Sequence, residues 1–168
     1  MNLITCFLVV VFKLLDRIYQ SNSSIICMGE DRFCGHAVAI KIVTDRVKAV
    51  GELKMLKRMG HPNIVSVTDC FEDNHCVAIV MELMSMDLKV FMHTVAYSFS
   101  TMKEIMLQSM RGLHHMHTRD FIHMDLKPYI LAINPTHPTE ISVSFAHNAV
   151  SLQGALRYVA RRPPFCVN

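Results

Sequence analysis

The change in hydrophobic period along the chain constrains its fold more than any other feature of the sequence. In residues 36–43, HAVAIKIV, β-branched side chains alternate around Lys41, which indicates a strand. From residue 47 to 59, apolar residues recur at i, i+3 and i+4, which indicates a helix. Two further runs, 64–71 and 75–83, flank the polar turn EDN and predict a hairpin. Strands and one helix therefore occupy the first half of the chain.

The second half of the chain has a mainly helical pattern. A short helix is predicted over 86–94 and a longer one over 100–120, with Ser100 as its N-cap. One short strand is predicted at 140–145, and an earlier strand, 24–30, runs into a turn. With 168 residues, the chain is one domain or slightly more. The fold class is therefore α+β, with an antiparallel sheet first and helices second.

Composition excludes several function classes. The net charge of +3 is small and spread along the chain, so nucleic acid is not an expected partner. The apolar run at 3–12 is shorter than the roughly 20 residues of a spanning helix, and no basic residue precedes it as in a signal peptide. We expect it to be a strand or helix packed on the domain or a disordered apolar tail, with secretion or membrane anchoring as the alternative. The six cysteines form no C-x-x-C pair, which predicts reduced thiols in the cytoplasm or nucleus.

The stretch FIHMDLKPYILAIN, residues 121–134, holds the clearest candidate for chemistry. It places Asp125 and Lys127 two residues apart in a short loop between apolar runs. A carboxylate and an ammonium held together in this way are typical of an active site.

Four segments in the same order resemble eukaryotic protein kinases, most closely the cyclin-dependent and mitogen-activated group. They are VAIK (38–41), GELKMLKRMGHPNIV (51–65), IVMELMSMDLKVFM (79–92) and IHMDLKP (122–128). The resemblance implies a kinase-like small lobe with an antiparallel sheet, and an incomplete helical large lobe that reaches the activation segment. The implied divisions are an N-terminal segment of uncertain role (1–23), the small lobe (24–84), the partial large lobe (85–162) and a tail (163–168).

The resemblance also implies roles for individual side chains. Lys41 would pair with the α- and β-phosphates of ATP, and Glu52 would hold Lys41 in place. Asp125 would accept the proton of the incoming hydroxyl, and Lys127 would offset charge on the γ-phosphoryl group. The glycine loop over the phosphates would begin at Gly29.

The adenine slot of such a domain lies between two strands of the sheet and the segment after them. The residues that the resemblance assigns to it are Ala39, Met81 as gatekeeper, Glu82 and Met84.

The departures from the family pattern fall on the metal-binding positions. Kinases hold Mg²⁺ with an Asn five residues after the catalytic Asp and with the Asp of an Asp-Phe-Gly turn. Here these positions are Ile130 and Ser144, the latter in the triplet 144–146. Isoleucine offers no oxygen and serine no carboxylate, so the Mg²⁺ site is predicted to be lost and ATP binding to be weak.

The glycine loop and its surroundings also depart from the pattern. Gly29 is followed by Glu30 and Asp31, and only about a dozen residues separate it from Lys41, so one strand of the sheet is expected to be absent. The interval from Lys41 to Glu52 is short as well, which weakens the expectation of their ion pair.

These observations predict a truncated, pseudokinase-like domain that acts by binding another protein. An active or weakly active Ser/Thr kinase is the first alternative, and a gene product without a selected role is the second. The residues of helix 100–120 expected to face a protein partner are Leu107, Met110, Leu113 and Met116. His114, His115 and His117 resemble a metal cluster, but the kinase resemblance explains His117 better, and no metal ligand is predicted.

Overall fold

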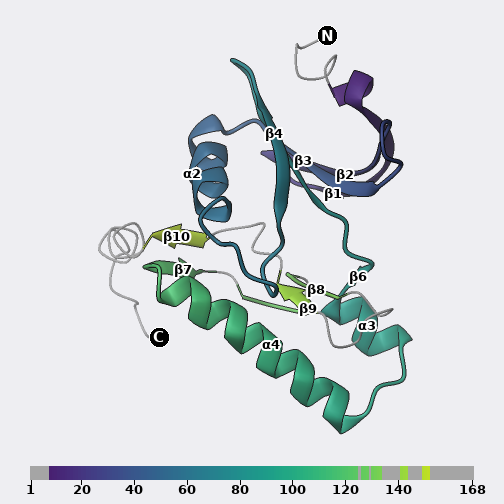
Figure 1. The fold of residues 1–168 in the computed structure, drawn as a ribbon, viewed down its shortest axis with the longest axis vertical. Helices are drawn as coiled ribbons and strands as arrows, with labels where there is room; N and C mark the ends of the chain where they lie inside the picture. The colour runs from purple at the N-terminus through teal and green to yellow at the C-terminus, as the bar shows by residue number, and fades with distance from the viewer. Residues whose placement is uncertain (1–7, 125, 129, 134–140, 144–148, 152–168) are drawn as a thin grey trace, which may run out of the picture. The chain divides into compact units, whose positions relative to one another are not determined.

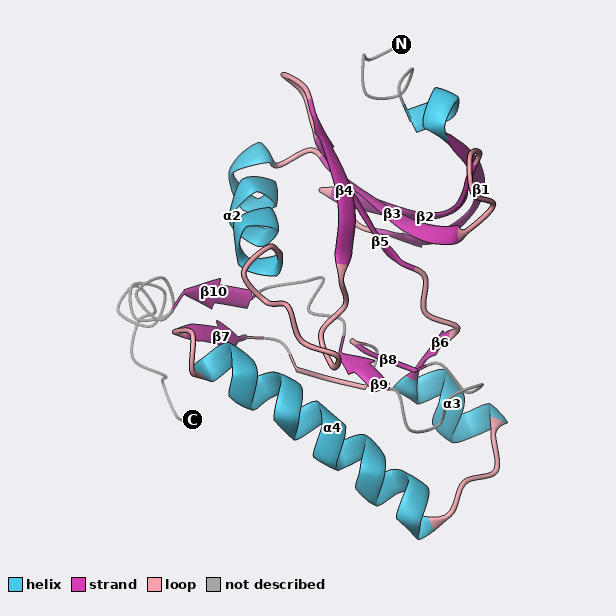
Figure 2. Ribbon diagram, in the orientation of Figure 1, coloured by secondary structure: helices cyan, strands magenta, loops and turns pink. Residues whose placement is uncertain are grey.

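The computed structural model describes residues 8–124, 126–128, 130–133, 141–143 and 149–151. Two compact units make up the chain, and each is described by itself. The first unit comprises Met1–Gly60 and Val65–Ser85, and the second comprises His61–Ile64 and Met86–Asn168. Figures 1 and 2 show the elements of both units.

The first unit is built on a five-stranded antiparallel sheet of order β1-β2-β3-β5-β4. Its strands are β1 (Phe12–Gln20), β2 (Ser24–Asp31), β3 (Ala37–Val43), β4 (Val67–Glu72) and β5 (Val77–Glu82). The predicted hairpin is confirmed as β4–β5, and β3 is buried over most of its length. Strands β3 and β5 are central in the sheet, which explains their nearly continuous apolar sequences.

Strand β1 corrects two expectations drawn from the sequence. The segment 1–23 was expected to have an uncertain role, but residues 12–20 pair with β2 as a full edge strand. The strand that was expected to be absent before Lys41 is therefore present as β2, and β1 precedes it. Alternation failed to reveal β1 because, apart from buried Phe12, most of its side chains on both faces are exposed.

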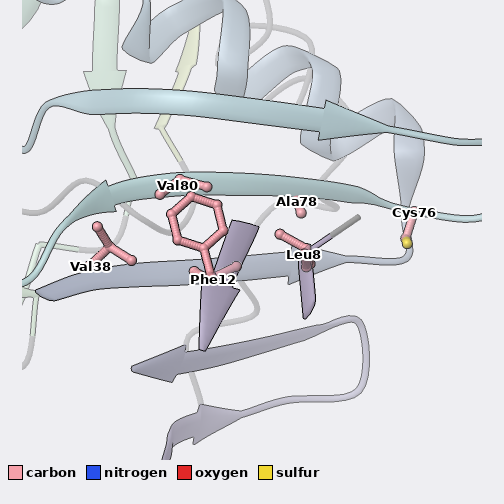
Figure 3. Packing of buried hydrophobic residues seen from close by; sticks show 7 residues of the cluster. Leu8, Phe12, Val38, Cys76, Ala78 and Val80 are labelled. Atoms are coloured by element: carbon pink, nitrogen blue, oxygen red, sulfur yellow. The ribbon is translucent and has the colours of Figure 1, made fainter. Parts of the chain in front are cut away.

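The described part of the apolar N-terminal run, residues 8–12, packs on the sheet, as the first of the expectations for this run predicted. Residues 8–11 are helical, and Leu8 and Phe12 are only 1% and 3% exposed. They join a core cluster with side chains of β3 and β5 (Figure 3). The Phe12 ring also meets the Phe71 ring edge to face, with centroids 6.2 Å apart.

Helix α2 (Arg46–Leu56) follows β3 after two residues. The side chain of Asp45 caps it by accepting a hydrogen bond from the backbone N–H of Lys48 at 3.2 Å. The helix is three residues shorter at its end than the predicted range of 47–59, where turns replace the helical pattern.

The second unit contains helices α3 (Leu88–Thr94) and α4 (Phe99–His117) and two small sheets. One sheet pairs β7 (Phe121–His123) with β10 (Ala149–Ser151), and the other has the order β6 (Met86–Asp87), β8 (Leu131–Ile133), β9 (Ile141–Val143). The N-cap of α4 is Ser98, whose hydroxyl accepts from the Thr101 N–H at 3.1 Å, and not Ser100 as predicted.

Helix α4 is amphipathic, and its buried side is only partly the one expected. The buried stripe follows helical spacing through Ile105, Gln108, Ser109, Gly112 and Met116. The prediction of an exposed Met116 is therefore wrong, because this residue continues the stripe and is 0% exposed. Leu113 is half-buried.

The opposite side of α4 is exposed and apolar. It carries Phe99, Met106, Leu107 and Met110, which are 43–88% exposed. Among the described residues, no helix is both long enough and apolar enough to cross a membrane.

Candidate functional site

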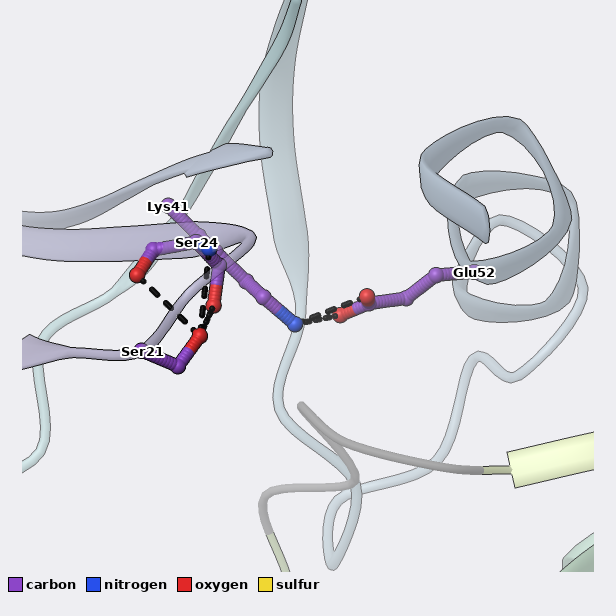
Figure 4. Close-up of polar contacts among 4 residues, drawn as sticks. All are labelled: Ser21, Ser24, Lys41 and Glu52. Atoms are coloured by element: carbon purple, nitrogen blue, oxygen red, sulfur yellow. Dashed lines mark hydrogen bonds and ion pairs between the residues drawn. The ribbon is translucent and has the colours of Figure 1, made fainter. Parts of the chain in front are cut away.

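Lys41 is the most buried charged residue among those described in the sheet. It lies on β3 between Ile26 of β2 and Ile79 of β5, and its side chain is 2% exposed. Its ammonium donates to both carboxylate oxygens of Glu52, at 2.6 and 2.7 Å (Figure 4). The ion pair that the short interval had called into question is thus formed, because α2 starts so soon after β3 that its second turn reaches Lys41.

Burial acts on both members of this pair and makes each dependent on the other. It lowers the pKa of the Lys41 ammonium, and the Glu52 carboxylate opposes that shift. It raises the pKa of the Glu52 carboxyl, and Lys41 opposes that shift in turn. Each charge therefore compensates the desolvation of the other, and removing one would leave a buried, unpaired charge.

The residues assigned to the adenine slot come together on the sheet. Ala39 and Met81 are register partners on β3 and β5, and both are buried. Glu82 is bound to the start of β4, because its N–H donates to the Ser66 carbonyl at 3.3 Å and its carboxylate accepts from the Ser66 N–H at 3.0 Å. Its side chain is therefore occupied in holding the strand.

Met84 lies just beyond the end of β5 and is half-buried. Within the part of the chain that the structure describes, its backbone N–H and carbonyl make no hydrogen bond. Both groups are thus available to a ligand that offers an acceptor and a donor close together.

Gly29 lies in a strand and not in a loop, which corrects its assignment. It pairs with Val38 of β3 and Leu14 of β1, in the second half of β2. A Cβ atom there would lie 2.9 Å from Cδ1 of Ile40, so the absence of a side chain makes room for the core. Its position gives no support to a role in phosphate binding.

The turn between β1 and β2 was missed in the sequence, although its composition signals it. The residues Ser21, Asn22, Ser23 and Ser24 form a polar cluster between two strands. The spacing of Tyr19, Ser21 and Ser24 is i, i+2, i+5, which is the spacing of the glycines in G-x-G-x-x-G. The spacing of this turn therefore matches that of a glycine loop, whereas Gly29 lies inside β2.

The loop after β7 is described only in part. Asp125 lies outside the described residues, and Lys127 is exposed. The Lys127 carbonyl accepts from the Ile130 N–H at 2.9 Å, which closes a turn. The Ile130 side chain is buried, 6% exposed, and leads into β8. The triplet 144–146 also lies outside the described residues, so Ile130 alone represents the expected metal positions.

The histidines near the end of α4 do not converge on a metal position. The rings of His115 and His61 are in contact, with centroids 4.6 Å apart and planes tilted by 42°, and Nδ1 of His115 lies 3.2 Å from a guanidinium nitrogen of Arg119. Within the described ranges, no three His, Cys, Asp or Glu side chains are grouped so that they could hold a metal ion.

The sheet with its buried Lys–Glu pair, and the loop that follows α4, are both features of protein kinases. A family model described as "Protein kinase domain" matches residues 18–141, which is well over half of the chain. The match spans β1 to β9 and includes every described site residue discussed above. The chain belongs to the protein kinase family.

Proposed function

We propose that this kinase domain transfers phosphate from ATP poorly or not at all, and that it acts by binding. The observation that carries the proposal is Ile130. It stands five residues after Asp125, where the family pattern has its metal-binding Asn, and its side chain is buried.

The donor set at this position does not fit magnesium. Mg²⁺ requires oxygen ligands in near-octahedral geometry at about 2.0–2.1 Å. Ile130 supplies no oxygen, and Ser144 offers a neutral hydroxyl where the family has a carboxylate. Loss of one preorganised electrostatic group typically lowers turnover by about 10²–10³, and loss of two lowers it further, though not additively.

Retained binding of an adenine nucleotide is supported by the first unit. The Lys41–Glu52 pair is formed, Ala39 and Met81 are side by side, and the backbone of Met84 is not engaged within the described chain. Nucleotide bound in this way needs no metal. At 100 times its dissociation constant it would stabilise the domain by about 2.7 kcal/mol.

The apolar side of α4 supports a protein as the binding partner. Phe99, Met106, Leu107 and Met110 expose large side chains along one helix. Several large apolar side chains exposed on one side of a helix are typical of a surface that meets another protein. A cytoplasmic or nuclear setting remains the prediction from the cysteine pattern.

The rival function is a working Ser/Thr kinase, and one observation favours it. The Lys41–Glu52 pair is the arrangement that active kinases require, and Asp125 and Lys127 are present in the sequence. The metal positions, and not this pair, therefore distinguish an impaired kinase from an active one.

A phosphate-transfer assay separates the two functions. The full chain is incubated with γ-labelled ATP and a generic acceptor protein, with Mg²⁺, with Mn²⁺ or with EDTA, beside Asp125→Asn. We expect transfer indistinguishable from that of Asp125→Asn under all conditions. We also expect a thermal shift with ATP that is the same with Mg²⁺ and with EDTA. Metal-dependent transfer that Asp125→Asn abolishes would establish the rival function instead.

A further inference from the structure

We infer that the Ser21 hydroxyl closes the β1–β2 turn on itself, and that the turn consequently binds no phosphate, so that the nucleotide site selects a purine nucleoside and gains little from a phosphate chain. The second half of this inference rests on the proposed binding of an adenine nucleotide. The first half concerns the turn alone and is testable without it.

The hydrogen bonds of the turn converge on one side-chain oxygen. Ser21 Oγ accepts from the backbone N–H of Ser24 at 3.1 Å and from that of Ser23 at 3.4 Å. It also lies 2.9 Å from Ser24 Oγ and 3.3 Å from the Ser24 carbonyl oxygen, to which it donates (Figure 4). A hydroxyl has one proton to donate and two lone pairs, so any three of these four contacts use its full capacity.

The same turn is closed by its backbone. The Ser21 N–H donates to the Ser24 carbonyl at 2.8 Å, and the Ser24 side chain is buried against the sheet. The turn therefore has a defined conformation in which the N–H groups of Ser23 and Ser24 point at Ser21 Oγ.

Backbone N–H groups in a turn are also what a phosphate-binding loop offers. Consecutive N–H donors form a concave site for an anion, and in kinases a glycine-rich loop covers the phosphates. Here the three glycine positions are Tyr19, Ser21 and Ser24, and Ile26 takes the Val position of G-x-G-x-x-G-x-V. Ser21 Oγ thus accepts the hydrogen bonds of the Ser23 and Ser24 N–H groups, which a phosphate oxygen would otherwise accept.

Binding a phosphate at this turn requires these bonds to break first. The loss of one neutral hydrogen bond changes an equilibrium constant by roughly 2- to 10-fold. The Lys41 ammonium, paired with both oxygens of Glu52, is the same in the wild type and in the Ser21 variants, so a comparison of these chains isolates the turn. The ligand best suited to the unit is therefore an uncharged purine nucleoside.

The test compares adenosine and ATP on the full chain, in EDTA, by calorimetry. We expect the two dissociation constants of the wild type to agree within about threefold. In Ser21→Gly the freed N–H groups should favour ATP over adenosine by about 5-fold or more. Ser23→Gly is the matched control, because it adds glycine to the same turn and keeps the Ser21 hydroxyl; it should behave as the wild type.

The second arm uses inorganic tripolyphosphate and amide resonances of the isotope-labelled chain. Added tripolyphosphate should shift the Ser23 and Ser24 amide signals in Ser21→Gly but not in the wild type. Amide exchange at both residues should be slow in the wild type and faster in Ser21→Gly and Ser21→Ala, the latter serving if the glycine variant does not fold.

The two parts of the inference fail in different ways. A wild-type preference for ATP of tenfold or more, or wild-type amide shifts with tripolyphosphate that Ser21→Gly does not change, would overturn it. So would exchange rates at Ser23 and Ser24 that neither Ser21 variant alters. If no variant binds adenosine or ATP, the proposed nucleotide binding and with it the preference for a nucleoside fail, while the tripolyphosphate and exchange data still decide whether Ser21 closes the turn.

Discussion

The two units of the chain treat their polar functional positions in opposite ways. In the first unit, the charged pair Lys41–Glu52 is inside the structure, with Lys41 only 2% exposed. In the second unit, the metal position that the structure describes is held by Ile130, an apolar residue that is itself buried. A charged pair of the family pattern is thus present where it is buried in the sheet, whereas a buried isoleucine stands where the pattern has an asparagine.

Physical chemistry explains the difference. Removing one member of a buried ion pair destabilises the fold, because the charge that remains is buried without a partner. Replacing a metal-binding amide by isoleucine removes a polar group and adds apolar burial, which costs the fold nothing and can stabilise it. The two positions therefore differ in what a substitution costs the fold: a change at Lys41 or Glu52 destabilises it, whereas an apolar residue at position 130 does not.

The largest effect is expected from Lys41→Met. The variant leaves the Glu52 carboxylate mostly buried without its ammonium, so the free energy of unfolding should fall by about 3–5 kcal/mol. Urea denaturation of the full chain, followed by circular dichroism, measures it. The double variant Lys41→Met/Glu52→Leu should recover much of the loss. A loss below about 1 kcal/mol in the single variant would show that the pair is not part of the core and would break the comparison.

A smaller effect is expected from Ile130→Asn, which returns the family's residue to the second unit. The amide enters a buried apolar position, so the free energy of unfolding should fall by about 2–4 kcal/mol, since lost apolar burial and an unsatisfied amide add together. Ile130→Val is the matched control, with a loss of about 0.5–1.5 kcal/mol. An asparagine variant as stable as the wild type would mean that this position had not been taken over by the core.

The smallest effect is expected at the start of α4, where a surface hydrogen bond and not burial is at stake. Ser98→Ala removes the cap on the Thr101 N–H and should cost about 1 kcal/mol. Ser100→Ala, inside the first turn, should change stability by less than about 0.5 kcal/mol. Thermal denaturation of both variants compares them directly, and equal losses would contradict the assignment of the cap.

The sequence was most informative where period and turn chemistry agree. Strand β3, helix α2 and the β4–β5 hairpin follow from alternation, helical spacing and the polar turn between strands. The edge strand β1 was missed because few of its side chains are buried, so its sequence shows no alternation of apolar and polar residues. Only Phe12 of its nine residues is buried. The cap at Ser98 was displaced by two residues because Ser100 is an equally suitable residue type.

The site was predictable as a set of residues but not as a geometry. The resemblance to kinases named Lys41 and Glu52, and the structure joins them. It also assigned the start of the glycine loop to Gly29, although Glu30 and Asp31 after it depart from the pattern; the conflict of a Cβ with Ile40 is visible only in three dimensions. The hydrogen bonds of the Ser21 hydroxyl could likewise not be predicted from the sequence, because they depend on the side of the turn on which each side chain lies.

The packing of Leu8 and Phe12 has a practical consequence for anyone who wishes to produce this domain. The family match begins at residue 18, near the end of β1. A fragment cut at that boundary would lose six of the nine residues of this edge strand together with Leu8 and Phe12, uncovering Ile40, Ala78 and Val80 to water. The limit of recognisable homology and the limit of the folding unit are therefore different here, and the second lies at least ten residues upstream.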